Sequence, residues 1–314
     1  MNTNVVKYQF QKLYRRVVQF VGSRWYVDSD PDSRKCILVA GTARSGTTWL
    51  ADLITSQLPC RLMFEPFHPK LVPEYAGFNY FQFMPPGQQC EKLYAFAQRV
   101  ISGDIRNRWI DRKNEQIFPR FRLVKEIRAN LLLKWLHDHF PEVPILFIIR
   151  HPCAVVLSRI ELGWATDTDI EPLLQQPDLV AHYLDDKLDL IRSVTHPEEK
   201  HAMIWSICNL VPLAQFRDNG MSLIYYEHLC TQAEVELPRL FESIHQNYDQ
   251  SIAERIMVPS STTRRTSAVI TGEDKIARWK KTLTTAQIDR ILRVVESFGL
   301  AHLYGDSLLP LNSS

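Results

Sequence analysis

A loop of sequence GTARSGTT, which begins at Gly41, separates an apolar run from a helix-like pattern. Because Gly41 and Gly46 let the backbone approach a ligand closely, N–H groups of the loop and of the next helical turn can converge on one anion. Thr47 and Thr48 add hydroxyl donors, and Arg44 adds a positive charge. The pattern predicts a phosphate-binding loop, against the alternative of an ordinary strand–turn–helix connection.

The loop departs from the nucleotide triphosphatase pattern G-x-x-x-x-G-K-[ST], because Thr47 stands where the lysine belongs and Arg44 precedes the second glycine. Such an enzyme also needs an aspartate after an apolar strand to hold Mg²⁺. The candidate run ILFII is instead followed by Arg150 and His151. A cation at that position argues against a magnesium-dependent kinase and suits a bound phosphate, so we expect no metal.

The segment after that run forms a second candidate phosphate site. Pro152 suits the first position of a helix, where its missing N–H costs nothing. Arg150 at the end of the strand and Ser158 two turns along the helix then converge at the edge where parallel sheets bind ligands. The alternative is a structural salt bridge at Arg150 and a Ser158 hydroxyl bonded to its own helix.

Short apolar runs alternate with helical patterns along the chain, which predicts an α/β fold with a central parallel sheet flanked by helices, a three-layer P-loop-containing fold. The expected strands are Cys36–Ala40, Arg122–Val124, Ile145–Ile149 and Ser222–Tyr226. The expected helices are Thr48–Leu58, Asn130–Phe140, Cys153–Leu162, Glu198–Phe216, Glu234–Ile244, Asp274–Lys281 and Thr285–Phe298, with a loop at Pro259–Gly272. Residues 76–120 show weak periodicity and are expected to be an inserted, substrate-facing segment.

The 314 residues are expected to form an N-terminal basic helical extension (1–34), one α/β domain (35–305) and a C-terminal tail (306–314). A balance of 37 Lys and Arg against 35 Asp and Glu does not support non-specific nucleic-acid binding, so local clusters must recognise anions.

Six scattered cysteines without a C-x-x-C pair fit a reducing compartment, and no apolar run approaches the ~18–20 residues that span a bilayer. We therefore expect a cytoplasmic protein. The basic amphipathic run at residues 5–20 is interpreted either as a helix packed on its own domain or as a peripheral contact with an anionic membrane.

The two phosphate segments together resemble the PAPS-dependent sulfotransferases, where PAPS is 3′-phosphoadenosine 5′-phosphosulfate. GTARSGTTW resembles the 5′-phosphosulfate loop of that family, and IIRHPCAVVLSR resembles its 3′-phosphate segment. FEP, YYEHL and ARWKKTLTTAQIDRIL follow in the family's order, across residues 36–300. FEP and the loop arginine are most similar to the carbohydrate sulfotransferase branch.

The resemblance implies a role for individual residues. Arg44 would contact the 5′-phosphosulfate and stabilise charge on the leaving phosphate, with Ser45, Gly46, Thr47 and Thr48 around the 5′-phosphate. Trp49 would stack on the adenine and Tyr226 would approach it, while Arg150 and Ser158 would hold the 3′-phosphate. Arg264 and Arg265 are candidates for further 3′-phosphate contacts, in a loop that departs from the R-K-G pattern of cytosolic members.

An acceptor hydroxyl needs a general base, and both the resemblance and the chemistry suggest Glu65. Its alternative role is a helix-capping or salt-bridging carboxylate, and Glu126 and His68 are the next candidates. The histidine of the cytosolic K-x-H motif is replaced by Ile127, so Lys125 is either a site residue or a plain strand-end lysine.

The sequence predicts an enzyme that transfers a sulfuryl group from PAPS to a hydroxyl, releasing PAP, with a carbohydrate or glycoconjugate as acceptor. Positioned arginine and N–H donors can stabilise the phosphate leaving group without Mg²⁺. The rival predictions are a P-loop small-molecule kinase and a non-catalytic nucleotide-binding module.

Overall fold

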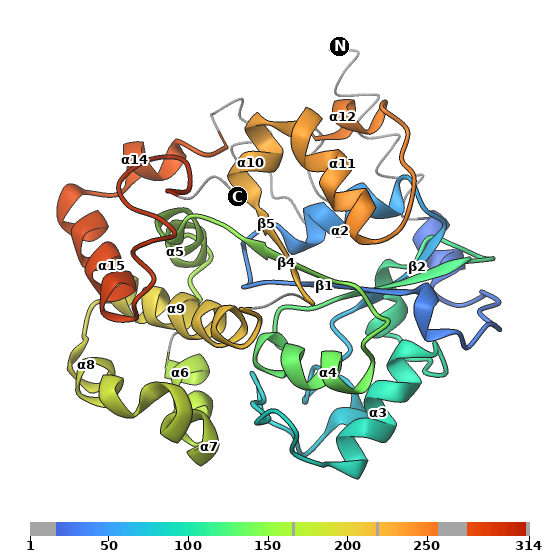
Figure 1. Ribbon diagram of the computed structural model, residues 1–314, viewed down its shortest axis with the longest axis horizontal. Coiled ribbons are helices and arrows are strands. Elements are labelled where there is room, and N and C mark those ends of the chain that lie inside the picture. The colour runs from blue at the N-terminus through green and yellow to red at the C-terminus, as the bar shows by residue number, and fades with distance from the viewer. Residues whose placement is uncertain (1–16, 165–166, 218–219, 257–274, 312–314) are drawn as a thin grey trace.

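The computed structural model describes residues 17–164, 167–217, 220–256 and 275–311. Its centre is a five-stranded sheet in which every neighbouring pair is parallel, in the order β2-β3-β1-β4-β5 (Figure 1). The strands are β1 (Cys36–Ala40), β2 (Cys60–Phe64), β3 (Phe121–Lys125), β4 (Ile145–Ile149) and β5 (Ser222–Tyr225). With helices on both faces, this sheet confirms the α/β fold class that the alternating sequence pattern predicts.

Four of the five strands lie where the sequence predicts them, and β2 was missed. β2 contains the buried Arg61 in its second position, as β3 contains the buried Arg122, so neither strand is a continuous apolar run. The predicted end of β5 was also wrong by one residue. Tyr226 is the first residue of the next helix and lies beyond the strand.

Helices form the outer layers (Figure 1). They are α2 (Thr47–Thr55), α3 (Glu91–Ile101), α4 (Leu133–His139), α5 (Pro152–Ile160), α6 (Asp167–Leu174), α7 (Pro177–Leu179), α8 (Leu188–Ser193), α9 (Pro197–Gln215), α10 (Tyr226–Thr231), α11 (Ala233–Ser243), α12 (Ile252–Arg255), α14 (Arg278–Thr282) and α15 (Thr285–Ser297). Over the described stretches of chain, no helix combines the length and the apolarity that a bilayer crossing requires.

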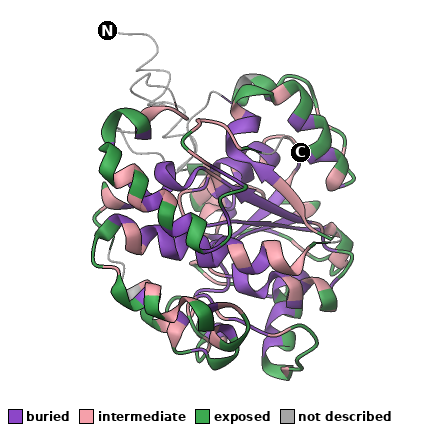
Figure 2. Cartoon of the chain, turned by 60° about the vertical axis from the view of Figure 1, so that its left-hand side comes forward, coloured by how far each residue is buried: buried purple, intermediate pink, exposed green. Residues whose placement is uncertain are grey.

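The two faces of the sheet are covered by different helices because alternate strand residues point to opposite sides. Ile37 and Val39 pack with α2 and α11, whereas Leu38 and Ala40 pack with α3 and α4. The strands are buried on both faces, and exposed residues lie on the outer sides of the helices (Figure 2). This burial explains the continuous apolar runs of β1 and β4.

The seven predicted helices each have a counterpart, but two variable regions hold helices that the sequence did not predict. Helix α3 lies within the segment 76–120, and α6, α7 and α8 lie between residues 167 and 193. The predicted loop at 259–272 lies outside the described residues, as does most of the run at 5–20.

A buried ion-pair network ties two peripheral segments to the edge of the sheet. In β2, Arg61 Nη1 lies 3.1 Å from Asp28 Oδ2, and Arg61 Nε lies 2.9 Å from Asp111 Oδ1. In β3, Arg122 Nη1 lies 2.9 Å from Asp28 Oδ1. The N-terminal segment around Asp28 and the short helical turn Ile110–Lys113 are therefore held against the same edge strand, β2.

The C-terminal segment is anchored to the helix that follows β5 through a buried carboxylate. Glu227 Oε2 accepts a 2.9 Å hydrogen bond from the Tyr304 hydroxyl, and Oε1 accepts one of 2.9 Å from the His151 N–H. Burial raises the pKa of Glu227, and both hydrogen bonds favour its charged form. The ends of β4 and β5 are thus fixed relative to each other beside the predicted 3′-phosphate segment.

We expect Tyr304→Phe to lower the free energy of unfolding by about 1–3 kcal/mol, because it leaves a buried acceptor of Glu227 without its donor. Urea denaturation measures this change. Tyr94→Phe is the matched control, because that tyrosine is 39% exposed and its ring is retained; a change under about 0.5 kcal/mol is expected there. Equal changes for the two variants would contradict the anchoring role.

Candidate active site

The loop between β1 and α2 has the shape that an anion-binding turn requires. Gly46 precedes α2 with a φ of 105°, and a Cβ added to it would lie 2.7 Å from the ring of Tyr226. A Cβ on Gly41 would lie 2.3 Å from the carbonyl oxygen of Ile148. Both glycines are therefore needed for close packing, and the first N–H groups of α2 point out of the carboxyl edge of the sheet.

Within the loop, Ser45 is engaged in holding the turn itself. It is fully buried, and both its N–H and its hydroxyl donate to the carbonyl oxygen of Thr42, at 3.0 and 2.6 Å. The hydroxyl of Thr42 is buried without a hydrogen-bond partner among the described residues. Ser45 thus shapes the loop, and the expected direct contact between Ser45 and a phosphate stays a prediction.

Arg44 joins the two predicted phosphate segments. Its Nε donates a 2.9 Å hydrogen bond to the hydroxyl of Ser158 on α5, 114 positions along the chain. Arg44 also has a φ of 79°, a conformation that costs a non-glycine residue energy and is found mostly at functional sites. The fold therefore brings the loop arginine and the serine of the second segment together, a direct contact that the sequence did not predict.

Arg150 leaves the end of β4 and lies against the same loop. Its guanidinium donates to the carbonyl oxygens of Arg44 at 3.3 Å and Lys275 at 3.0 Å, and it lies 4.3 Å from the ring centroid of Tyr226. Its Nε is buried without a hydrogen-bond partner, and no carboxylate among the described residues forms an ion pair with it. The alternative of a structural salt bridge at Arg150 stays a prediction, since the charge of Arg150 acts to lower the pKa of the buried Glu227.

Lys275 is a basic residue of this site that the sequence analysis missed. Its ammonium donates a 2.8 Å hydrogen bond to the carbonyl oxygen of Ile256, and burial lowers its pKa. The sequence pointed to Arg264 and Arg265 as the basic residues of the C-terminal loop, and both lie outside the described residues. Lys275 directly follows that loop, which is the only signal that the sequence contains for it.

Trp49 and Tyr226, the two aromatic residues expected at the adenine, contact each other. Their ring centroids lie 5.2 Å apart in an edge-to-face arrangement, and both side chains are buried. Tyr226 also covers Gly46 on one side and Arg150 on the other. The rings of Trp49 and Tyr226 thus lie beside the predicted phosphate loop. The stacking of Trp49 on an adenine base stays a prediction.

A second cluster of charges lies where β2 and β3 end. The carboxylate of Glu65, directly after β2, pairs with Lys125 Nζ at 2.6 Å and with the guanidinium of Arg128. Glu65 has a φ of 49°, which makes it another non-glycine residue in a strained conformation. Because β3 is the neighbour of β1, this cluster lies on the same edge of the sheet as the phosphate loop.

The environment of Glu65 has opposing effects on its protonation. Burial disfavours the charged carboxylate, but the charges of Lys125 and Arg128 together outweigh burial and lower the pKa of Glu65 below 4.5. Glu65 is therefore ionised at neutral pH and able to accept a proton, although each oxygen is engaged with a cation. Both ion pairs match the alternative role of a salt-bridging carboxylate that the sequence left open for Glu65, but the sequence did not identify Lys125 and Arg128 as its partners.

The two other candidate bases are placed differently. Glu126 is fully buried, and its oxygens accept hydrogen bonds from the N–H groups of Phe67 at 2.8 Å, Ile127 at 3.1 Å and Arg128 at 3.3 Å. Burial raises the pKa of Glu126 to about 7, and that of His68 is lowered to about 4 by burial and by Arg128. Glu126 thus holds the backbone that carries Arg128, and His68 is a neutral side chain.

Aromatic rings and a further cation surround Glu65. Trp109 Nε1 donates to the carbonyl oxygen of Glu65 at 3.2 Å, and the rings of Trp109 and Tyr80 lie 5.2 and 5.3 Å from that of His68. The guanidinium of Arg112 lies 3.3 Å from the ring centroid of Trp109. Tyr80, Trp109 and Arg112 come from the segment 76–120, which the sequence predicts to face the substrate.

A magnesium site of the kinase type would need a carboxylate after a strand that neighbours β1. The two neighbours are β4, followed by Arg150 and His151, and β3, followed by Glu126. The carboxylate of Glu126 is already bonded to three N–H groups. Across the part of the chain that the structure describes, no three His, Cys, Asp or Glu side chains are grouped as metal ligands.

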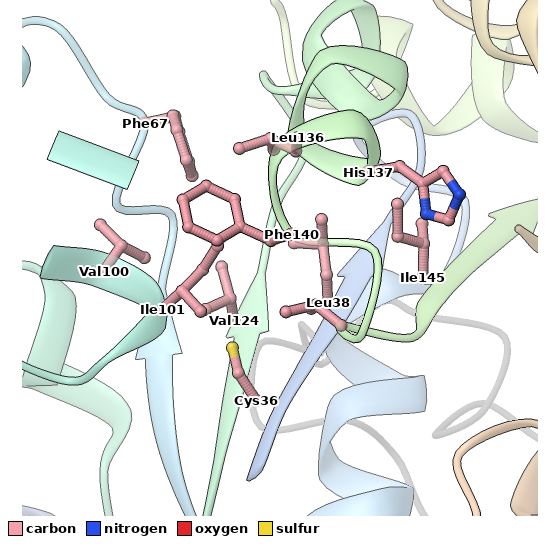
Figure 3. Close-up of a pocket in the computed structure, with 11 residues that line it drawn as sticks. Cys36, Leu38, Phe67, Val100, Ile101, Val124, Leu136, His137, Phe140 and Ile145 are labelled. Atoms are coloured by element: carbon pink, nitrogen blue, oxygen red, sulfur yellow. The ribbon is translucent and has the colours of Figure 1, made fainter. Parts of the chain in front are cut away.

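An apolar cavity on the other face of the sheet is separate from this site (Figure 3). Its walls include Leu38, Phe67 and Phe140, and its volume is about 10 Å³. That volume has room for about one water molecule. The cavity belongs to the packing between the sheet and helices α3 and α4, not to a ligand site.

Neither a protein-family model nor a curated protein matches this chain. Solved structures do. A sulfotransferase domain from the curacin biosynthetic pathway is 15% identical over 84% of this chain and 96% of that domain, with a TM-score of 0.45. The corresponding domain of the Synechococcus olefin synthase is 14% identical over 88% and 98%, with a TM-score of 0.44. A mouse sulfotransferase complexed with PAP is 13% identical over 90% and 87%, with a TM-score of 0.37. At such identities the chain is similar to these sulfotransferases in fold alone.

Proposed function

We propose that this protein transfers a sulfuryl group from PAPS to a hydroxyl group. Two segments at the same edge of the sheet would bind the two phosphate positions of this one nucleotide. The hydrogen bond between Arg44 Nε and Ser158 Oγ carries the proposal. It joins a loop suited to a 5′-phosphate to a segment suited to a 3′-phosphate, and Arg150 lies against both. A nucleotide with a phosphate on each side of its ribose would contact both segments at once.

The residues present fit such a nucleotide. The N–H groups that begin α2, with Arg44, suit the 5′-phosphosulfate, whereas Arg150, Ser158 and Lys275 suit the 3′-phosphate. The buried Arg150 Nε and Thr42 hydroxyl, which have no partner in the described chain, are groups that phosphate oxygens would satisfy. When bound, PAPS supplies an activated sulfuryl group whose leaving group is a phosphate anion.

Glu65 is the residue that we propose takes the proton from the acceptor hydroxyl. Lys125 and Arg128 keep its carboxylate ionised, so it is ready to accept a proton at neutral pH. They also fix its position. The fully buried Glu126 has a supporting role, because its oxygens are bonded to the backbone.

A carbohydrate is the acceptor that we propose. Sugar rings present apolar C–H faces to aromatic side chains and hydroxyls to charged ones. The half-buried Trp109 and Tyr80, which pack on the buried His68, offer aromatic surface beside Glu65, and Arg128 offers a partly exposed cation. The likeness of the FEP segment to the carbohydrate branch supports the same acceptor class.

Titration calorimetry with PAP, ADP and ATP tests the nucleotide assignment. We expect PAP to bind more tightly than ADP, because only PAP places a phosphate at Arg150 and Ser158. Turnover is then followed with labelled PAPS and a panel of neutral and acidic oligosaccharides. Tighter binding of ATP would favour a kinase, and PAP binding without transfer to any hydroxyl would favour a non-catalytic module.

We expect EDTA to leave the turnover of PAPS largely unchanged. The cation that we propose at the 5′-phosphosulfate is Arg44, and Glu126 is already bonded to N–H groups. Initial rates with EDTA and with added Mg²⁺ should therefore agree within about twofold. Loss of a catalytic metal, which contributes several kcal/mol, would lower the rate far more than twofold. A strict requirement for Mg²⁺ would contradict the metal-free proposal.

A further inference from the structure

Exposed apolar side chains concentrate on one part of the protein. Of the eleven large apolar residues exposed in the described chain, six lie in two short segments, 17–27 and 117–118. Phe118 is 73% exposed and Trp25 is 61% exposed. We call this set the aromatic surface: Val17, Phe20, Trp25, Val27, Ile117 and Phe118.

The two segments of the aromatic surface lie side by side, and residues 17–27 belong to the dark blue part of the chain (Figure 1). The N–H of Val27 donates to the carbonyl oxygen of Ile117 at 2.8 Å, and Asn114 Nδ2 donates to the carbonyl oxygen of Gly22 at 2.7 Å. The buried Asp28 and Asp111 ion pairs hold both segments to the sheet. The aromatic surface is therefore built on an anchored backbone.

A cavity lined by three arginines adjoins the aromatic surface. Its volume is about 320 Å³, and its lining residues are Gln19, Phe20, Ser23, Arg24, Arg108 and Arg112. None of these carries a negative charge. The guanidinium of Arg24 lies 3.9 Å from the ring centroid of Phe20, and Arg112 Nε is buried without a hydrogen-bond partner in the described chain. The cavity suits an anionic group.

The segment 105–120, which surrounds this cavity, carries a net positive charge, as the three arginines of the cavity do. Residues 105–120 contain five basic and two acidic side chains. Of the two acidic residues, Asp111 is buried in its pair with Arg61, and Glu115 accepts a hydrogen bond from Gln19. The solvent side of this segment therefore presents positive charge beside exposed aromatic rings.

We propose that the aromatic surface and the arginine-lined cavity dock the protein on an anionic phospholipid bilayer. Aromatic side chains favour the interface between headgroups and acyl chains, and arginines attract the lipid phosphates. The cavity would take one headgroup phosphate while Phe20, Trp25 and Phe118 enter the interface. This docking does not rest on the sulfuryl transfer proposed above, although Arg112 lines the cavity and also packs on Trp109 beside Glu65.

Co-sedimentation with vesicles tests the docking. One set of vesicles contains phosphatidylcholine alone, and the other contains equal parts of phosphatidylcholine and phosphatidylglycerol. We expect the full chain to bind the anionic vesicles at least about tenfold more tightly, because each arginine near an anionic surface contributes about a fivefold increase in binding. Added salt should weaken the binding.

Two kinds of variant separate the aromatic from the electrostatic part. Combining Trp25→Ser with Phe118→Ser should lower binding to anionic vesicles by about tenfold or more, because both rings leave the interface. Arg24→Glu combined with Arg108→Glu should abolish the preference for anionic vesicles. PAP affinity, measured in the same preparations, should stay unchanged in both and show that the variants are folded.

Matched controls come from the opposite side of the molecule. Val27 and Val235 are exposed to similar extents, 54% and 49%, but Val235 lies on α11, beside β5 at the other edge of the sheet. Val27→Ser should weaken vesicle binding, and Val235→Ser should not. Arg293→Glu on α15 is the control for charge reversal.

Three results would overturn the docking proposal. One is equal binding to neutral and anionic vesicles, and another is no vesicle binding by the unaltered protein. The third is a dimer in light scattering that Trp25→Ser with Phe118→Ser splits into monomers. That result would show that a second copy of the chain covers the aromatic surface.

Discussion

Replacing Glu65 with glutamine is expected to lower kcat by roughly 10²–10⁴-fold while PAP affinity stays nearly unchanged. The amide keeps the shape of the side chain but cannot accept a proton from the acceptor hydroxyl. Single-turnover rates with labelled PAPS measure the loss, and calorimetry measures PAP affinity. A glutamine variant that retains more than about a tenth of wild-type kcat would show that Glu65 is not the base.

The variant must also be tested for a cost in folding. Glu65→Gln leaves Lys125 and Arg128 as unpaired cations in a partly buried site, and breaking such a buried pair costs about 3–5 kcal/mol. The double variant Glu65→Gln with Arg128→Met restores part of the charge balance. If Glu65 is the base, thermal stability should recover in the double variant and kcat should not. If both thermal stability and kcat recover in the double variant, Glu65 has a structural role and is not the base.

The pH dependence of kcat follows from the same ion pairs. Because Lys125 and Arg128 lower the pKa of Glu65, the active carboxylate form persists at neutral pH and is lost only as the pH falls through that lowered pKa. The Glu65→Gln variant should lack this acidic limb. Arg128→Met removes one of the two cations, so it should move the limb to higher pH. An unmoved limb in Arg128→Met would assign it to another group.

Arg150→Ala is expected to weaken PAP binding by about 2–5 kcal/mol, or roughly 30- to 4,000-fold, the cost of removing a charge-assisted and partly desolvated contact. Adenosine 5′-phosphosulfate lacks the 3′-phosphate, so its binding should change far less. Calorimetry with both nucleotides measures the difference. The control Arg293→Ala removes an exposed arginine on α15 and should change neither affinity.

Arg150 also donates to the carbonyl oxygens of Arg44 and Lys275, so its loss could disturb the phosphate loop as a whole. That effect would weaken both nucleotides to the same extent. Equal losses would therefore assign Arg150 to the structure of the loop, and they would leave the 3′-phosphate without its principal cation. Ser158→Ala, which removes the acceptor of Arg44 Nε, should give a smaller loss of about 0.5–1.5 kcal/mol.

The sequence by itself determined the elements whose signals are local. Apolar runs identified β1, β4 and β5, and the short run Leu123–Val124 identified β3, because strands buried on both faces carry no alternation. Gly41 and Gly46 identified the phosphate loop, since close approach of other groups excludes a side chain there. Arg150 directly after an apolar run was placed at the carboxyl edge for the same local reason.

The tertiary structure alone decided the features that depend on partners far apart in the chain. β2 forms around Arg61 only because Asp28 and Asp111 neutralise that arginine in the interior. Glu65 meets Lys125 because β2 and β3 pair in parallel, which joins positions 60 residues apart. The positive φ angles of Arg44 and Glu65 likewise arise from surrounding contacts, since side-chain type alone disfavours them.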